Sequence, residues 1–110
     1  MSFVPTTIIS AQAITATGNE ATGHAVIGDS LSVEIIVSAA SGTTPSVTFS
    51  VQWSDDGVNY AAANPADVFT AITAVGNIDQ RFTVKGAYYR LAWVVSGTTP
   101  SLTTTIEVLN

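Results

Sequence analysis

The chain has no cysteine, one histidine and three basic residues. The missing cysteines exclude a disulfide framework and thiol chemistry, and with only one histidine they also exclude the usual four-ligand zinc sites. Three basic residues against eight acidic ones leave a net charge of −5, which disfavours nucleic acid because phosphate binding draws mainly on lysine and arginine. We therefore expect no metal, no cofactor and no nucleic-acid partner.

Charge of either sign and long apolar runs are also scarce. Charged residues make up 10% of the chain, against about 25% in ordinary domains, whereas there are 16 threonines and 11 serines. Hydroxyl groups must therefore cover most of the polar surface. No apolar run approaches the ~18 residues of a membrane span, and the opening MSFVPTTIIS lacks the basic and apolar regions of a secretory signal. We expect one domain, large enough to fold without a disulfide, and no membrane association.

A duplicated hexapeptide is the clearest positive feature of the sequence. SGTTPS occurs at Ser41–Ser46 and again at Ser96–Ser101, each copy between two runs of alternating apolar and polar residues. Alternation of period two predicts β-strands. Gly42 and Gly97 are expected to take a positive φ, and the proline of each copy to hold the preceding threonine extended. Each unit is therefore predicted to be strand, loop, strand, and the protein to be built largely from two similar β-hairpins.

Eight strands are predicted, and no stretch carries a convincing helical pattern. In chain order they cover Thr6–Thr15, His24–Ile27, Leu31–Ser38, Val47–Trp53, Val68–Val75, Gln80–Lys85, Tyr89–Val95 and Leu102–Val108. The short segments between them contain the Gly, Asn, Asp or Pro that tight turns require. The prediction is an all-β fold, a single antiparallel β-sandwich or jelly-roll-like domain over residues 1–110.

The N-terminal segment, residues 1–14, holds three isoleucines and no charge. It is interpreted either as an edge strand of the domain or as an arm laid on a neighbouring subunit, since an exposed apolar edge invites aggregation. We expect a homo-oligomer, with a trimer favoured. The candidate assembly contacts are Phe3, Val4, Ile8 and Ile9, together with Arg90. Arg90 is expected on the outer face of its strand, either in an intersubunit salt bridge or as a solvated charge.

Few residues have the chemistry of a functional site. The turn from Asp55 to Asn59 offers oxygens of the kind that calcium binds, but Asp-Gly is also a leading hairpin signal, and a structural turn is favoured. His24 has no motif that would bring a nucleophile to it and is interpreted as a surface histidine. No spacing among the acids indicates a glycosidase pair. We predict that the protein is not an enzyme and has no catalytic residue.

The aromatic residues allow two interpretations. Trp53 and Trp93 alternate in phase with the apolar positions of their strands, which predicts that both lie in the core. The alternative is a stacking platform for sugars, formed with Tyr60, Tyr88 and Tyr89.

Two stretches resemble a known group of proteins. TPSVTFSVQWSDDGVNY in the middle and YYRLAWVVSGTTPSLTTTIEV near the C-terminus are similar to small β-sandwich proteins of tailed bacteriophage particles, over roughly residues 28–110. In that group a strand runs into a Ser-Asp-Gly-x-x-Trp/Tyr turn, and a closing strand pair surrounds an SGT(S/T)PS loop. The matching positions are Trp53, Ser54, Asp56, Gly57, Tyr60, Arg90 and Ser96–Ser101.

The resemblance implies a structural protein of the virion. The expected role is that of a capsid decoration or cement protein, which binds the outside of a phage head and stabilises it, with the major capsid protein as its partner. The expected location is the virion, after synthesis in the host cytoplasm. A phage tail component, a carbohydrate-binding module and an adhesin-like β-sandwich are the alternatives.

Overall fold

The computed structural model describes residues 4–110, which form seven β-strands and no helix. The strands are β1 (Thr6–Ile14), β2 (Gly18–Asn19), β3 (His24–Ala25), β4 (Ser30–Ser54), β5 (Ala61–Val68), β6 (Gly76–Thr83) and β7 (Tyr88–Leu109). Every strand pairing among them is antiparallel. The predicted all-β antiparallel fold is confirmed.

Two long strands organise the sheet. β4 has 25 residues and β7 has 22, and they pair with each other from Ser32↔Leu109 to Ser54↔Tyr88. Each SGTTPS copy lies in the middle of its strand, and the two copies face each other, with Ser41 opposite Ser101. The prediction of two separate hairpins is therefore wrong. Alternating apolar and polar residues on either side of each copy favour a strand, but they do not specify which strand it pairs with. Here each copy pairs with the other copy.

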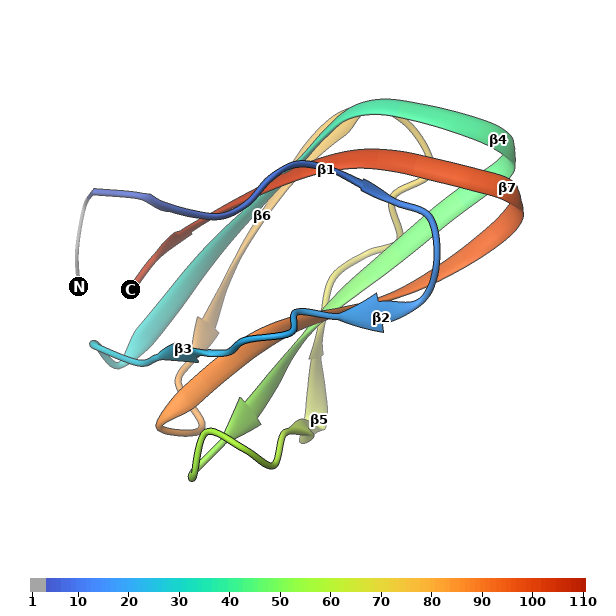
Figure 1. Ribbon diagram of the computed structural model, residues 1–110. Helices are drawn as coiled ribbons and strands as arrows, with labels where there is room; N and C mark the ends of the chain where they lie inside the picture. The colour runs from blue at the N-terminus through green and yellow to red at the C-terminus, as the bar shows by residue number, and fades with distance from the viewer. Residues whose placement is uncertain (1–3) are drawn as a thin grey trace.

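The hexapeptides bend this strand pair back on itself, as Figure 1 shows at the end where the β4 and β7 labels lie. Gly42 and Gly97 have φ of 103° and 113°, as predicted. Thr44 and Thr99 were expected to be extended, but they have φ of 46° and 45°. The proline that follows disfavours the right-handed helical region for these threonines without forbidding the left-handed one. Two left-handed residues per strand, with register shifts between them, produce the bend.

The bend divides the sheet into two halves that face each other (Figure 1). We call one the aliphatic half: β1, β6, residues 30–37 of β4 and residues 102–109 of β7, in the order β6-β4-β7-β1. The other is the aromatic half: β2, β3, β5, residues 47–54 of β4 and residues 88–95 of β7. In this half β5 borders β4, and β2 and β3 both pair with β7.

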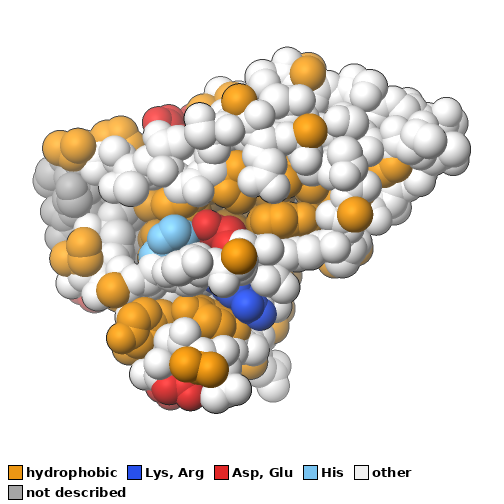
Figure 2. All heavy atoms as spheres, viewed as in Figure 1, with side chains coloured by type: hydrophobic (Ala, Val, Ile, Leu, Met, Phe, Trp, Pro, Cys, Tyr) orange, Lys and Arg blue, Asp and Glu red, His pale blue; other side chains and the backbone are white. Residues whose placement is uncertain are grey.

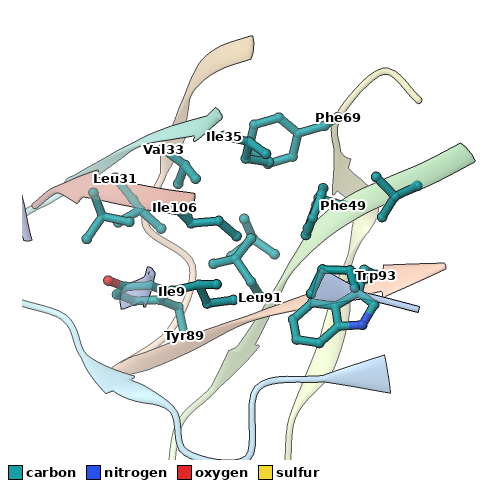
Figure 3. Packing of buried hydrophobic residues seen from close by; sticks show 14 of the residues in the cluster. Ile9, Leu31, Val33, Ile35, Phe49, Phe69, Tyr89, Leu91, Trp93 and Ile106 are labelled. Carbon is teal, nitrogen blue, oxygen red and sulfur yellow. The ribbon is translucent and has the colours of Figure 1, made fainter. Parts of the chain in front are cut away.

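One hydrophobic core lies between the halves, because alternate residues of each long strand point inward. Figure 3 shows Ile35 and Ile106 of the aliphatic half in the same cluster as Phe49 and Leu91 of the aromatic half. Trp53 and Trp93 are 6% and 7% exposed, so their predicted core positions are confirmed. The other most deeply buried side chains include Leu31, Val33, Val37, Val47, Val51 and Leu102.

The segment from residue 61 to residue 75 departs most from the prediction. β5 forms at Ala61–Val68, where a loop was expected, and the expected strand over 68–75 is reduced to a single bridge between Val47 and Ile72. β5 is rich in alanine and contains Pro65, so its propensity for strand is low. It lies at the edge of the sheet beside β4, where a proline is tolerated.

The N-terminal segment forms an edge strand, which is one of its two interpretations. β1 pairs with β7, and Ile9 and Ile14 are 6% and 2% exposed in the core of their own chain. The arm interpretation is therefore wrong for Thr6–Ile14. Residues 1–3 lie outside the described part of the chain.

Candidate functional site

A cleft of about 410 Å³ between β1 and residues 19–24 holds the single histidine. Ile8, Ile9 and Trp93 supply its apolar walls, and Glu20 and His24 are among its polar ones. Figure 2 shows the histidine and an acidic side chain together in this hollow, with hydrophobic side chains on either side. We take this cleft as the candidate site because its two ionisable side chains, Glu20 and His24, contact each other directly.

Glu20 is bonded on both carboxylate oxygens. One oxygen lies 2.8 Å from Nε2 of His24, and the other accepts the Leu91 backbone N–H at 2.9 Å. The Glu20 N–H in turn donates to the Leu91 carbonyl. The Glu20 side chain is 9% exposed and that of His24 30%, so His24 lies at the surface, as predicted, and is also bonded to a nearly buried carboxylate, which was not predicted. The pair attaches the short β2 and β3 segments to β7, and both carboxylate oxygens are satisfied without a substrate.

Tyr89 lies beneath this pair, with its ring centroid 5.1 Å from that of His24. Burial of the phenol raises the pKa of Tyr89 well above its ordinary value, and the negative charge of Glu20 raises it further. The phenol is therefore neutral over the whole physiological range. The cleft thus contains a nearly buried carboxylate and an imidazole, with the neutral phenol of Tyr89 packed against the imidazole outside the cleft lining.

The turn after β4 is closed by the Asp56 carboxylate. Its Oδ1 accepts hydrogen bonds from the Ser54 hydroxyl and from the backbone N–H groups of Val58 and Asn59, at 2.8–2.9 Å. Its Oδ2 accepts one from the Asn59 side-chain amide. These bonds, led by the Asn59 N–H, hold the pKa of Asp56 far below its usual range. The carboxylate faces donors of its own turn, as the structural interpretation of this turn requires.

The described part of the chain brings no cluster of further metal ligands to this turn. Across residues 4–110 there is no group of three or more histidine, cysteine, aspartate or glutamate side chains arranged to hold a metal ion.

Arg90 lies on the outer face of the aromatic half, where it was expected, and contacts groups of its own chain. Its Nε donates to Oε1 of Gln52 at 2.7 Å, and its guanidinium lies 4.6 Å from the centroid of the Tyr60 ring. The hydroxyl end of Tyr60 lies against the Gly23 backbone, where a side chain would collide with it. An intersubunit contact of Arg90 stays a prediction.

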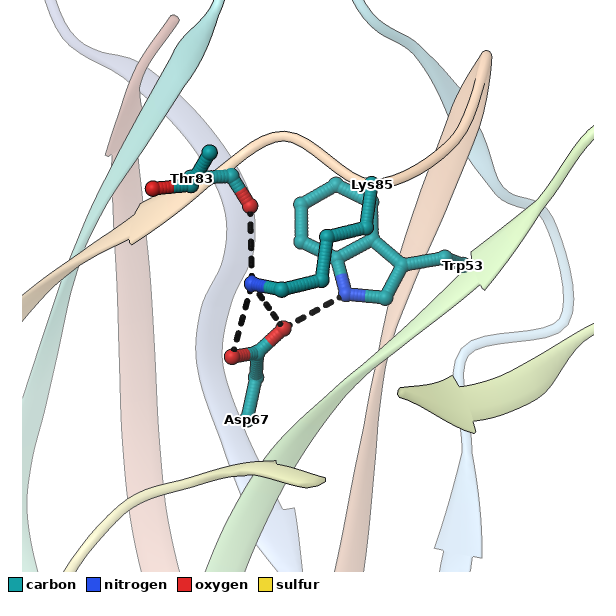
Figure 4. A network of polar contacts seen from close by, with 4 residues as sticks. All are labelled: Trp53, Asp67, Thr83 and Lys85. Atoms are coloured by element: carbon teal, nitrogen blue, oxygen red, sulfur yellow. Dashed lines mark hydrogen bonds and ion pairs between the residues drawn. The ribbon is translucent and has the colours of Figure 1, made fainter. Parts of the chain in front are cut away.

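The tryptophans are anchored by their indole nitrogens. Trp93 donates to the Ala16 carbonyl at 3.1 Å, and Trp53 donates to Asp67 at 2.8 Å. Figure 4 shows that Lys85 completes the second network, with its ammonium 3.0 Å from Asp67 and bonded to the Thr83 carbonyl. Both rings are buried, so neither can present a face to a sugar.

The remaining assembly candidates are divided between core and surface. Ile9 belongs to the core, and its proposed contact with a neighbour is wrong because its side chain is already buried. Ile8 is partly buried against the same core, and Val4 is 75% exposed. Contacts through Ile8 and Val4 stay predictions, and Phe3 lies outside the described residues.

The two hexapeptides form a surface that the sequence did not reveal as one unit. Residues 41–44 and 96–99 are exposed and together make an uncharged end of the molecule, which we call the tip. In Figure 2 it projects at the right, nearly free of charged side chains. A side chain at Gly42 would meet the Thr99 carbonyl at 2.6 Å, and one at Gly97 would meet the Thr44 carbonyl at 2.6 Å. The two bends are thus packed backbone against backbone.

Comparison with known proteins adds no assignment. No protein-family model matches the chain, and no curated protein has a sequence similar to it. Nowhere in residues 4–110 is there a helix with the length and hydropathy needed to cross a membrane.

Proposed function

We propose that the protein is a structural component of a phage particle, a decoration or cement protein that binds the outside of the head and stabilises it. The sequence resemblance supplies the class of protein. The structural observation that supports it best is the tip, which is exposed, uncharged and held rigidly by the pairing of its two copies.

The composition of the tip suits contact with a protein shell. Each copy presents serine and threonine hydroxyls and no charge. Burying a hydroxyl that finds a hydrogen-bond partner costs far less than burying an unpaired charge, so such a surface can be covered by another protein at low cost. The reciprocal packing of Gly42 and Gly97 fixes the backbone before binding, which reduces the entropy lost on contact.

The same reasoning favours a contact at the tip over one at the N-terminus. The isoleucines that an arm would have offered to a neighbour already belong to the core or pack against it. β4 and β7 run from the tip directly into the hydrophobic core, so a contact made there is supported by the whole sheet. One small contact is weak, but a shell of repeated sites that engages several copies of a linked oligomer multiplies its effect.

The carbohydrate-binding alternative is not supported by the aromatic residues. A sugar platform needs exposed rings, whereas Trp53, Trp93 and Tyr89 are buried, Tyr60 and Tyr88 are half-buried, and Arg90 lies over the Tyr60 ring. Location on the head or on the tail is decided by labelling the protein and imaging the native particle.

The proposal is tested by co-sedimentation with empty heads of the phage that encodes the chain. Thr43 and Thr98 face each other in the tip, so Thr43→Glu and Thr98→Glu each place a charge in the proposed contact. We expect each to weaken binding at least about tenfold. Thr70→Glu, at an exposed position outside the tip, is the matched control and should bind like the unchanged protein.

Two results would count against the proposal in different ways. Failure of the unchanged protein to sediment with the heads would remove the decoration role. Equal binding by the tip variants and the control would keep that role and move the contact to another surface.

A further inference from the structure

β6 is the only long and regular sheet edge in the described part of the chain. Its eight residues pair with β4 without a register shift, from Ser30↔Thr83 to Val37↔Gly76, and with no other strand of residues 4–110. The sequence GNIDQRFT contains no proline. The outward N–H and C=O groups of this edge are therefore arranged to accept another strand.

The other edges are interrupted. β1 has two register shifts and a positive φ at Ala11, β5 has a register shift and Pro65, and β2 and β3 have two residues each. Bulges, prolines and short length are the usual devices that prevent an edge from pairing with another chain. β6 carries none of these three devices, and its two charged residues, Asp79 and Arg81, have opposite signs, so it is the edge suited to pairing with a second copy.

The charges of the aliphatic half point to the kind of strand that would pair there. Asp79 of β6 is directly opposite Glu34 of β4, and Glu34 is directly opposite Glu107 of β7. Like charges opposite each other destabilise a sheet. At the β1 end of this row Thr7 donates a long hydrogen bond, 3.4 Å, to Glu107. At the β6 end the row stops at the open edge, where a cation would relieve it.

β6 itself carries that cation, two residues beyond Asp79. Arg81 is exposed on the same outer face, and the ion pairs within residues 4–110 are His24–Glu20 and Lys85–Asp67, so neither involves Arg81. If two β6 strands pair antiparallel about Gln80, Asp79 of each copy is opposite Arg81 of the other. The same register places Ile78 opposite Phe82 on the inner face. Opposite charges therefore meet on the outer face, and apolar side chains meet on the inner face.

We propose that the β6 edge is a self-association site at which two copies of this chain pair antiparallel, centred on Gln80. The partner's Arg81 then extends the row of Glu107, Glu34 and Asp79 with a positive charge. A two-fold pairing of this kind uses both open edges at once, so it closes as a dimer and does not grow into a fibre. The proposal is independent of what the tip binds.

Sedimentation equilibrium over a concentration series tests the charge pairing, in 0.15 M salt so that the net charge of −5 is screened. Because of the two-fold symmetry, Asp79→Arg creates two arginine pairs, each between residue 79 of one copy and Arg81 of the other. We expect dimerisation to weaken about tenfold or more. Arg81→Asp should have the same effect, and the double variant Asp79→Arg with Arg81→Asp should restore association. Asp55→Arg, in the exposed turn after β4, is the charge-matched control.

A second measurement tests the register. The chain has no cysteine, so Gln80→Cys introduces a single thiol that faces its own copy at the two-fold axis. We expect mild oxidation to yield a disulfide-linked dimer, whereas Asn77→Cys and Thr83→Cys, which are displaced from the axis, should not cross-link to themselves. A monomer at all concentrations, or an oligomer whose mass is unaffected by Asp79→Arg, would overturn the proposal. So would equal cross-linking at all three positions. A trimer, the state favoured from the sequence, would also overturn the proposal, because a two-fold pairing closes as a dimer.

Discussion

The two halves of the folded sheet are held together in different ways. In the aliphatic half the edge strands are long: β1 has nine residues, and β6 makes eight consecutive pairings with β4. In the aromatic half β2 and β3 have two residues each, and side-chain hydrogen bonds supplement their few backbone pairings. Glu20 and Asp67 there make bonds of 2.8–2.9 Å.

The difference shows how a short strand is retained in a sheet. A strand of two residues makes too few backbone hydrogen bonds to offset the entropy of ordering its flanking loops. Directed side-chain bonds to the neighbouring strand supply the remainder, as those of Glu20 and Asp67 do around β2, β3 and β5. The aliphatic half depends more on apolar area, so substitutions of its exposed polar residues should have small effects on stability; Asn110, buried at its end and bonded to Ile27 and Ser30, is the exception.

The largest expected effect comes from truncating the aromatic core. Trp93→Ala removes a buried ring, its contact with Phe49 and the bond to the Ala16 carbonyl, and should lower the free energy of unfolding by about 3–5 kcal/mol. Val94→Ala, on the opposite face of the same strand and 61% exposed, should change it by less than about 0.5 kcal/mol. Urea denaturation followed by circular dichroism measures both. Equal midpoints would show that Trp93 does not support the core.

The bend that joins the two halves should be next most sensitive. Gly42→Ala and Gly97→Ala each force a side chain into a left-handed backbone and against a carbonyl of the other copy, at an expected cost of about 1–3 kcal/mol. The two costs should be similar because the contacts are reciprocal. Gly76→Ala, where a side chain would meet nothing within 4 Å, is the control. Thermal melting of the three variants makes the comparison, and a cost at one glycine alone would contradict the reciprocity.

A matched pair of carboxylates compares the halves directly. Asp67→Asn removes the charge that Lys85 binds and should cost about 1 kcal/mol, reduced from the usual value because the lysine is partly exposed. Asp79→Asn removes a like charge opposite Glu34 and should leave the monomer unchanged or slightly more stable. Denaturant titration at protein concentrations below those of self-association separates the two. Similar losses would mean that both halves depend on polar contacts.

The smallest effect at neutral pH is expected for Tyr89. Its pKa is raised in the folded state, so the folded protein retains this proton at pH values where the unfolded chain has lost it. The resulting stability is complete below about pH 10, the ordinary tyrosine pKa, and decreases as the pH rises above it. Tyr89→Phe should therefore reduce the loss of stability between about pH 9 and pH 11. An identical alkaline profile in both proteins would show that the phenol does not titrate with unfolding.

The sequence alone determined the local features of the fold. Alternation of apolar and polar residues predicted the all-β class and the inward faces of Trp53 and Trp93, because side-chain direction in a strand follows from residue parity. Gly42 and Gly97 were predictable because only glycine adopts their φ without strain. The Asp56 turn was also predictable, because all of its hydrogen bonds join residues between Ser54 and Asn59 and so depend only on the local sequence.

The tertiary structure decided which strands pair with which. The two SGTTPS copies and their flanks meet the same local requirements as hairpin loops or as facing bends, and the second arrangement forms because it encloses one core between the two halves. β5 is a strand only because it lies beside β4, and Glu20 is a buried anchor only because Leu91, 71 residues away, lies opposite it. The tip, the cleft around His24 and the open β6 edge all arise from such long-range pairing, which a local pattern does not encode.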